Sequence, residues 1–376
     1  MTQHNDSRNG AERRFSRREI LGRAIGVGAG VTALGVLPLL GRSSQALAQS
    51  IRGGANGKVV VNNPGGALEE ATRKAIFMPF TAETGIEVVS FPTNGAKINA
   101  IVQSGNTQID VGDIAEHRAV TYEQQGALEK LDRSKFTRTN LADTGSAADY
   151  YVANNTYATV MGYNTEVFPS AHPHTWADFW NIKAFPGSRI LEDMSASFPN
   201  LEFALLADGV AMDKLYPLDV PRAFNKLREI RAHIVKWWDS GAVCAQMLAS
   251  KQAVMGSVWS GRILPLIDAK APLAIEWNQS SRLLQALCIL KGAPNLENAY
   301  KYIDYAMQPK QQADLARLTG YGPTNKKAFA FLDAQEANRL PTSPEHLKIS
   351  FATDARWWVT HQTEIANKWQ AFVLGE

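Results

Sequence analysis

The fold is constrained most by a regular alternation of short apolar segments with helical patterns, which begins at residue 59. Residues 59–61 read as a buried strand, residues 62–66 as a turn, and residues 67–80 as a helix with one apolar face. Further strands follow at residues 86–89 and 109–114, each before another helical pattern. This alternation predicts an α/β fold with a mainly parallel, doubly wound sheet.

The first 48 residues have the pattern of an export signal. Arg17 and Arg18 precede an uncharged stretch at residues 24–40, and residues 46–48 (Ala-Leu-Ala) offer a cleavage site. A membrane-spanning helix is the alternative interpretation, but five glycines and Pro38 in this region disfavour it. We therefore expect residues 1–48 to be a twin-arginine signal peptide, exported through the twin-arginine translocase to give a periplasmic protein.

Size and charge limit what the mature chain can be. Cleavage leaves 328 of the 376 residues, which favours two lobes over one core. The leader holds seven of the 39 basic and three of the 36 acidic side chains, so 32 basic and 33 acidic ones remain. This balance gives no support for nucleic-acid binding.

The chain has two cysteines, Cys244 and Cys288. In an oxidising compartment they could form a disulfide, and two buried thiols are the alternative. Buried thiols are favoured, because the fold inferred below places the two residues in different lobes, where a bridge would hinder hinge motion.

The motifs of common enzyme classes are absent from the sequence. It contains no HExxH, CxxC or GxSxG segment, and the glycine-rich residues 26–30 belong to the export signal. The segment His172-Pro173-His174 is read as a loop, because histidines separated by proline lack the spacing that lets two imidazoles converge on a metal. We expect no metal, no cofactor and no catalytic residue, which favours a binding protein over an enzyme.

Five segments, in order along the mature chain, resemble the periplasmic solute-binding proteins of ABC importers, in the branch of the spermidine/putrescine-binding proteins. They are the strand, turn and helix of residues 59–89, the Trp-x-Asp-Phe-Trp segment within residues 175–187, the Met-Gly-x-x-Trp segment within residues 254–262, the helix of residues 299–309, and the Tyr-Gly-Pro-Thr-Asn turn of residues 321–325.

This resemblance implies a type II periplasmic-binding fold, in which two α/β lobes joined by crossing strands close on a solute. The protein would be a monomeric receptor that delivers a small solute to a membrane permease and its ATPase. The alternative from another class is a periplasmic enzyme that uses Asp113, Glu116 and His117. Lobe 1 would hold residues 56–154 and 278–322, lobe 2 residues 158–273 and 325–376, and the crossings would lie near residues 152–157 and 273–277.

The resemblance also places the solute between the lobes. Asn63, Gly65 and Gly66 end the first strand and open a helix, where free N–H groups can bind a ligand, although an ordinary turn explains the same pattern. Asp113 and Glu116 end the third strand and are candidate contacts, with helix capping as their alternative role.

Further candidates come from lobe 2 and from the crossings. Trp259 matches the family tryptophan that packs against the ligand, and its alternative is a core position. Arg262 can bind a carboxylate or form a surface ion pair. Asp193 falls near a family carboxylate that binds ammonium groups, and an N-cap role fits it as well. The remaining candidates are Thr156, Glu276, Trp277 and Tyr321.

Two departures from the polyamine binders bear on the solute. The loop at residues 63–66 lacks their aromatic and acidic residues, and Gln285 stands where they tend to carry an acid. Fewer acids, together with Arg262, favour an amino-acid-like or carboxylate solute. A polyamine is the alternative.

Overall fold

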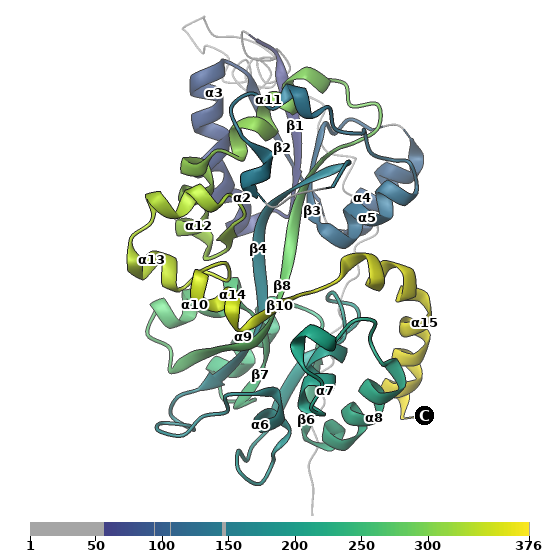
Figure 1. Ribbon diagram of the computed structural model, residues 1–376, viewed down its shortest axis with the longest axis vertical. Coiled ribbons are helices and arrows are strands. Elements are labelled where there is room, and N and C mark those ends of the chain that lie inside the picture. Colours follow the sequence, from purple (N-terminus) through teal and green to yellow (C-terminus); the bar gives the residue numbers. More distant parts are fainter. Residues whose placement is uncertain (1–55, 94, 106, 145–147, 376) are drawn as a thin grey trace, which may run out of the picture. The chain divides into compact units, whose positions relative to one another are not determined.

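The computed structural model describes residues 56–93, 95–105, 107–144 and 148–375, so the twin-arginine motif and the cleavage pattern lie outside the described residues. The predicted α/β class is confirmed: one mixed sheet of ten strands is flanked by helices (Figure 1). Within the described part of the chain, no helix combines the length and the apolar character that crossing a membrane requires.

The strands are short except for two. Their bounds are β1 Lys58–Asn63, β2 Glu87–Pro92, β3 Val111–Ala115, β4 Tyr151–Asn164, β5 Arg189–Glu192, β6 Ile234–Trp238, β7 Met255–Trp259, β8 Leu273–Ile289, β9 Gly322–Pro323 and β10 Ser350–Ala352. Their order in the sheet is β2-β1-β3-β8-β4-β7-β5-β6, with β10 beside β8 and β9 beside β4.

The helices lie between these strands and after them. Their bounds are α2 Gly66–Thr72, α3 Met78–Thr84, α4 Gly95–Ser104, α5 Glu116–Gln124, α6 Trp176–Trp180, α7 Leu201–Ala207, α8 Val220–Ile230, α9 Gly241–Ala249, α10 Ser260–Asp268, α11 Leu296–Ala306, α12 Pro309–Thr319, α13 Ala334–Asn338, α14 Pro344–Lys348 and α15 Ala355–Leu374. A π-helical turn, Arg73–Phe77, joins α2 to α3, so the helix predicted over residues 67–80 continues to residue 84.

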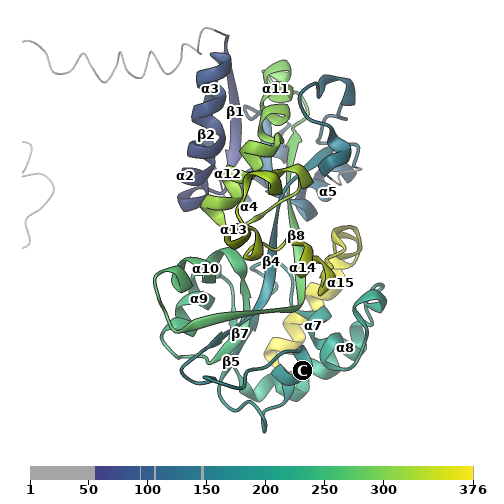
Figure 2. The same ribbon diagram turned by 60° about the vertical axis from the view of Figure 1, so that its left-hand side comes forward.

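The long strands β4 and β8 run antiparallel through the middle of the sheet (Figures 1 and 2). Their pairing extends from Tyr151 opposite Cys288 to Asn164 opposite Leu273. At one end β8 also pairs with β3, and at the other end β4 also pairs with β7. Two parallel groups of strands, β2-β1-β3 and β7-β5-β6, are therefore joined through one shared ladder.

The neighbours of β8 change in steps along its length. Residues 273–276 pair with residues 161–164 of β4, beside β7, and pairing with β3 begins only at Gln285. Between these stretches, Ser280–Arg282 pair with β10. The apolar pattern ends at Trp277, but backbone hydrogen bonds carry the strand through the polar residues that follow.

Buried apolar side chains gather at both ends of this ladder. Two clusters draw on residues 59–152 and 286–315, and the others on residues 157–283 and 351–372. Ala355 at the start of α15 packs with the first group, and Arg356 forms an ion pair with Glu123 of α5 at 2.8 Å. The division into two lobes follows these clusters closely and stays a prediction.

Both cysteines are buried and free, as favoured from the sequence. Cys244 lies in α9 and Cys288 in β8, and their thiols donate to the carbonyls of Gly241 and Gly112. Burial raises the pKa of each thiol to about 12. Neither thiol is therefore a reactive group at neutral pH.

A fully buried cation holds the start of β5. Arg189 is 0% exposed and donates to three backbone carbonyls, those of Phe179 at 2.9 Å, Phe185 and Gly187. Burial lowers the pKa of Arg189 to about 10. The planar guanidinium can satisfy three carbonyls at once, which an ammonium group cannot do in the same geometry.

We expect Arg189→Lys to lower the free energy of unfolding by about 1–3 kcal/mol, because buried carbonyls lose their donors. Arg228→Lys is the matched control, since Arg228 is exposed and donates to one side chain, Asn225. Urea unfolding of both variants measures the difference. Equal stability of the two would contradict this account of Arg189.

Candidate functional site

Three aromatic rings meet where β4, β7 and the turn after α12 come together. The ring of Tyr157, in the middle of β4, lies 6.2 Å from that of Trp259 and 6.1 Å from that of Tyr321. Gly261 makes the approach of Tyr321 feasible, because a Cβ there would lie 2.2 Å from the tyrosine ring. Trp259 and Tyr321, both predicted from the sequence, are thus brought together around Tyr157, which was not.

Two buried carboxyl groups flank these rings. Asp113 on β3 is 5% exposed, and burial raises its pKa to about 7. The side-chain amides of Gln285 and Asn154 act in the opposite direction, because hydrogen bonding favours the ionised carboxylate. Glu192, the last residue of β5, is 2% exposed, and burial raises its pKa well above the ordinary value. We call Asp113, Tyr157, Glu192, Trp259 and Tyr321 the central cluster.

Several polar atoms of this region have no hydrogen-bond partner among the described residues. Buried polar atoms in folded proteins are nearly always paired, so an unpaired group indicates a ligand or water that completes it. The atoms are Asp113 Oδ1, Asn155 Oδ1, Glu192 Oε1, Ser197 Oγ and Trp259 Nε1. The Trp259 indole lies near enough to the Glu192 carboxyl to lower its pKa against the larger effect of burial, so these two groups are neighbours that share the same recess. The atoms of this set combine acceptors with an N–H donor, which suits a small polar solute.

Residues from both ends of the ladder line a small recess beside the cluster. Glu116 and His117 at the start of α5 face Tyr157 and Phe198, and the His117 and Phe198 rings are 5.0 Å apart. The Glu116 carboxylate accepts a hydrogen bond from the Tyr151 hydroxyl at 2.9 Å, and burial raises its pKa. Burial lowers the pKa of His117 to about 3, so this imidazole is neutral at neutral pH.

Arg262 supplies a positive charge at the edge of the cluster. It follows β7 in α10, its side chain is exposed, and it forms no ion pair with any acid in the described part of the chain. Its charge lowers the pKa of Tyr321, against the larger opposite effect of burial, so the guanidinium lies within electrostatic reach of the cluster. An arginine that has no acidic partner among the described residues can bind the carboxylate of a solute.

The turn after β1 lies beside the strand that carries Asp113, because β1 pairs with β3. Gly65 and Gly66 have φ of 77° and 61°, which explains the two glycines. The Asn63 side chain accepts from Gly65 N at 2.8 Å and donates to Ser90 at 2.7 Å, so it holds the turn. Contact of these three residues with a solute stays a prediction.

Other predicted contacts lie apart from the central cluster or on another face of the strand. Thr156 is buried next to Tyr157 in β4, and alternation directs their side chains to opposite faces. The Asp193 carboxylate accepts from Trp369 Nε1 at 2.9 Å and from Ser195, whereas the adjacent Glu192 faces the cluster. Trp277 stacks on His346 with ring centroids 4.1 Å apart.

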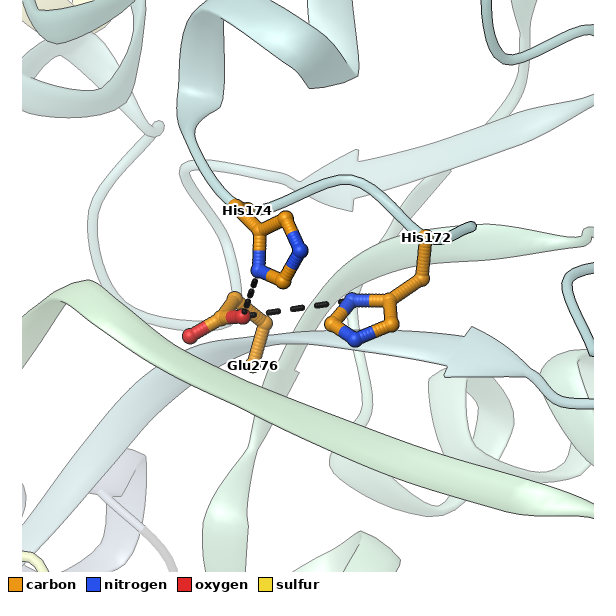
Figure 3. A group of neighbouring side chains, drawn as sticks. All are labelled: His172, His174 and Glu276. Atoms are coloured by element: carbon orange, nitrogen blue, oxygen red, sulfur yellow. Dashed lines mark hydrogen bonds and ion pairs between the residues drawn. The ribbon is translucent and has the colours of Figure 1, made fainter. Parts of the chain in front are cut away.

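Glu276 lies with two histidines that the sequence analysis treated as unable to converge. The rings of His172 and His174 are only 4.1 Å apart, and His174 Nδ1 is 2.9 Å from the Glu276 carboxylate (Figure 3). The expectation from the proline spacing was wrong, because residues two apart in an extended segment project to the same side.

Comparison with known proteins identifies relatives along most of the chain. Residues 75–342 match the family described as bacterial extracellular solute-binding protein. A γ-aminobutyric acid-binding protein of Pseudomonas aeruginosa is 35% identical over 315 residues, which cover 82% of this chain and 88% of that protein. A spermidine/putrescine-binding periplasmic protein of Escherichia coli is 23% identical over 277 residues, 71% of this chain and 78% of that protein.

Solved structures agree with these relatives. An ABC transporter substrate-binding protein from Bradyrhizobium japonicum superposes with a TM-score of 0.78 at 37% identity, covering 84% of this chain and 99% of that one. A structure of a γ-aminobutyric acid (GABA) receptor superposes with a TM-score of 0.75 at 36% identity, covering 84% and 97%.

The pH dependence of stability tests the environment of Asp113. A carboxyl whose pKa rises from 3.8 to about 7 on folding stabilises the protein fully below pH 4 and loses that contribution as the pH rises towards 7. Asp113→Asn removes this titration. Relative to the wild type, the variant should gain up to about 1.4 kcal/mol of unfolding free energy per pH unit between pH 4.5 and 6.5.

Urea unfolding of the ligand-free mature protein across this range measures the difference. Asp149→Asn serves as the control, because the Asp149 side chain is 54% exposed and pairs with Lys130 at the surface. Parallel profiles for the wild type and Asp113→Asn would show that Asp113 is not held in its neutral form.

Proposed function

The chain belongs to the bacterial extracellular solute-binding proteins, and on this premise we propose that it is the receptor of an ABC importer for a short ω-amino acid such as GABA. The observation that carries the proposal is the unpaired Arg262 beside a cluster of buried carboxyl groups and aromatic rings. Family membership confirms the expectation of a solute receptor and not an enzyme.

The amine end of such a solute fits the interior of the cluster. Asp113 Oδ1 and Glu192 Oε1 are buried acceptors without described partners, and an ammonium group supplies three donors. A bound cation would also favour the ionised carboxylates that burial disfavours. The rings of Tyr157 and Trp259 add π faces that attract a cation.

The carboxylate end fits the exposed edge, where Arg262 can donate two parallel hydrogen bonds. A polyamine is the alternative solute and needs acceptors at both ends. Arg262 stands against it, since a second ammonium group there would meet an unpaired positive charge. The polyamine-binding relative is also less similar to this chain than the GABA-binding one, at 23% against 35% identity.

Solute binding would cause two lobes to close. One lobe holds residues 56–154 and 278–322, and the other holds residues 158–273 and 325–376. The clusters of buried side chains support this division, and the contact of His117 with Phe198 lies across it. A solute favours the closed state only through contacts made in that state. Asp113 and Trp259 stand on opposite sides of the division, so one solute can engage both lobes.

The closed receptor would then dock, as a monomer, on its permease and ATPase.

The mature receptor would reach the periplasm by the twin-arginine route. The leader of residues 1–48 supports this proposal through its arginine pair, its uncharged stretch and its cleavage pattern. Substrates of this route usually cross the membrane already folded.

Arg262→Ala should raise the Kd for GABA at least tenfold, about 1.4 kcal/mol, because the solute carboxylate loses its partner. The Kd for putrescine should stay level or fall. Isothermal titration of the mature protein measures both, with Arg228→Ala as the exposed-arginine control. Absence of GABA binding by the wild type, with tight binding of putrescine, would replace the ω-amino acid by the polyamine alternative.

Replacing both Arg17 and Arg18 by lysine should leave the full-length precursor in the cytoplasm, since the translocase recognises the arginine pair. Replacing Arg13 and Arg14 by lysine is the control, because this pair lies farther from the uncharged stretch. Cell fractionation and immunoblotting report the distribution. Unimpaired export of the first variant would contradict the twin-arginine route.

A further inference from the structure

His172, His174 and Glu276 bring three metal-binding groups to one place outside the central cluster (Figure 3). One nitrogen of each histidine and one carboxylate oxygen all lie within 4.8 Å of one another. Glu276 Oε2 is 2.9 Å from His174 Nδ1 and 3.9 Å from His172 Nδ1. The two histidines come from the segment between β4 and α6, whereas Glu276 comes from β8.

Neighbouring groups fix the orientation of these side chains. The backbone N–H of Asn278 donates to Glu276 Oε1 at 2.8 Å, which leaves Oε2 facing the histidines. The Asn278 amide donates to the His174 carbonyl at 3.0 Å and anchors the loop to β8. The His172 ring stacks on Tyr163, with centroids 4.7 Å apart. Outer contacts of this kind orient metal ligands.

The loop is also anchored at its far end. Trp176 is fully buried, and both its backbone N–H and its indole N–H donate to Gln279 at 3.0 Å. The backbone that carries the two histidines is therefore fastened to β8 at His174 and at Trp176. A preorganised site loses less entropy when an ion binds.

The ligand set selects the kind of ion. Imidazole nitrogens suit zinc and its neighbours among the first-row transition metals, whereas calcium and magnesium prefer sites made only of oxygen. Three protein ligands with an open side are typical of zinc sites that keep a water molecule as fourth ligand. Exposed fractions of 27%, 66% and 15% for the side chains of His172, His174 and Glu276 leave such a side open.

We propose that His172, His174 and Glu276 form a Zn²⁺ site that links the loop before α6 to β8. The site is separate from the solute-binding cluster, because Glu276 lies opposite Met161 in the ladder, whereas the cluster lies around Tyr157 opposite Leu283. The ion would replace the hydrogen bond of His174 with Glu276 and fasten the loop to a strand that both parallel groups share.

Titration of ZnCl₂ into untagged, chelator-treated mature protein tests the site. We expect one equivalent to bind with a Kd of about 10 μM or lower and to raise the thermal midpoint. His172→Ala and His174→Ala should each weaken binding at least about tenfold. His233→Ala is the matched control, because His233 is exposed and lies outside the group. Ca²⁺ should not compete.

Circular dichroism and urea unfolding establish that the variants fold, and His172→Gln replaces the alanine variant if removing the ring from Tyr163 impairs folding. Co²⁺ binding to the wild type gives a second measurement, since its visible absorption reports a four-coordinate site of nitrogen and oxygen ligands. Zn²⁺ binding that is absent, or unchanged in both histidine variants, would overturn the proposal. So would equal affinity for Ca²⁺.

Discussion

The antiparallel pairing of β4 with β8 is the constraint on which the rest of the structure depends. One ladder, from Tyr151 opposite Cys288 to Asn164 opposite Leu273, joins two groups of parallel strands that have no other neighbour in common. Tyr157 of the central cluster stands near its middle, between the irregularities at Ala153/Asn155 and at Thr159/Met161 that interrupt the register. Irregularities of this kind bend a strand and redirect side chains, so the same feature bends the ladder and sets the direction of the Tyr157 side chain.

The central cluster is costly for the empty protein. Asp113 and Glu192 are buried acids, and several buried polar atoms have no partner among the described residues. Leaving one such group unpaired costs about 1–3 kcal/mol. A solute that paired these atoms would recover the cost, and because Asp113 stands on β3 and Glu192 on β5 it would contact both parallel groups of strands. In the proposed receptor, the instability of the empty site would therefore be part of the energy that drives closure.

The sequence predicted the features that repeat along the chain and missed those that depend on pairing between distant segments. Alternating strands and helices predicted the α/β class. Trp259 and Tyr321 were proposed as solute contacts from the family resemblance, and Asp113 because it ends the third strand; their contact with a solute stays a prediction. Asp193 was the candidate named from the sequence, and Glu192 was not considered, since a buried acid and its less buried neighbour look alike without the position of Trp369. His172 and His174 were set aside because of their proline spacing, and nothing in the sequence indicated that Glu276 of β8, 102 residues after His174, lies beside their loop.

Burial differs between the two charged ends of the proposed site, and this difference fixes how a zwitterionic solute would lie. Asp113 and Glu192 are almost inaccessible, whereas Arg262 is exposed. Charges attract more strongly where water is excluded, so the ammonium end gains most at the buried carboxyls. The carboxylate end, which loses much when stripped of water, stays at the exposed arginine and keeps part of its hydration. The reverse orientation would bury a carboxylate against two acids. The asymmetry thus selects one orientation before any detail of shape is considered.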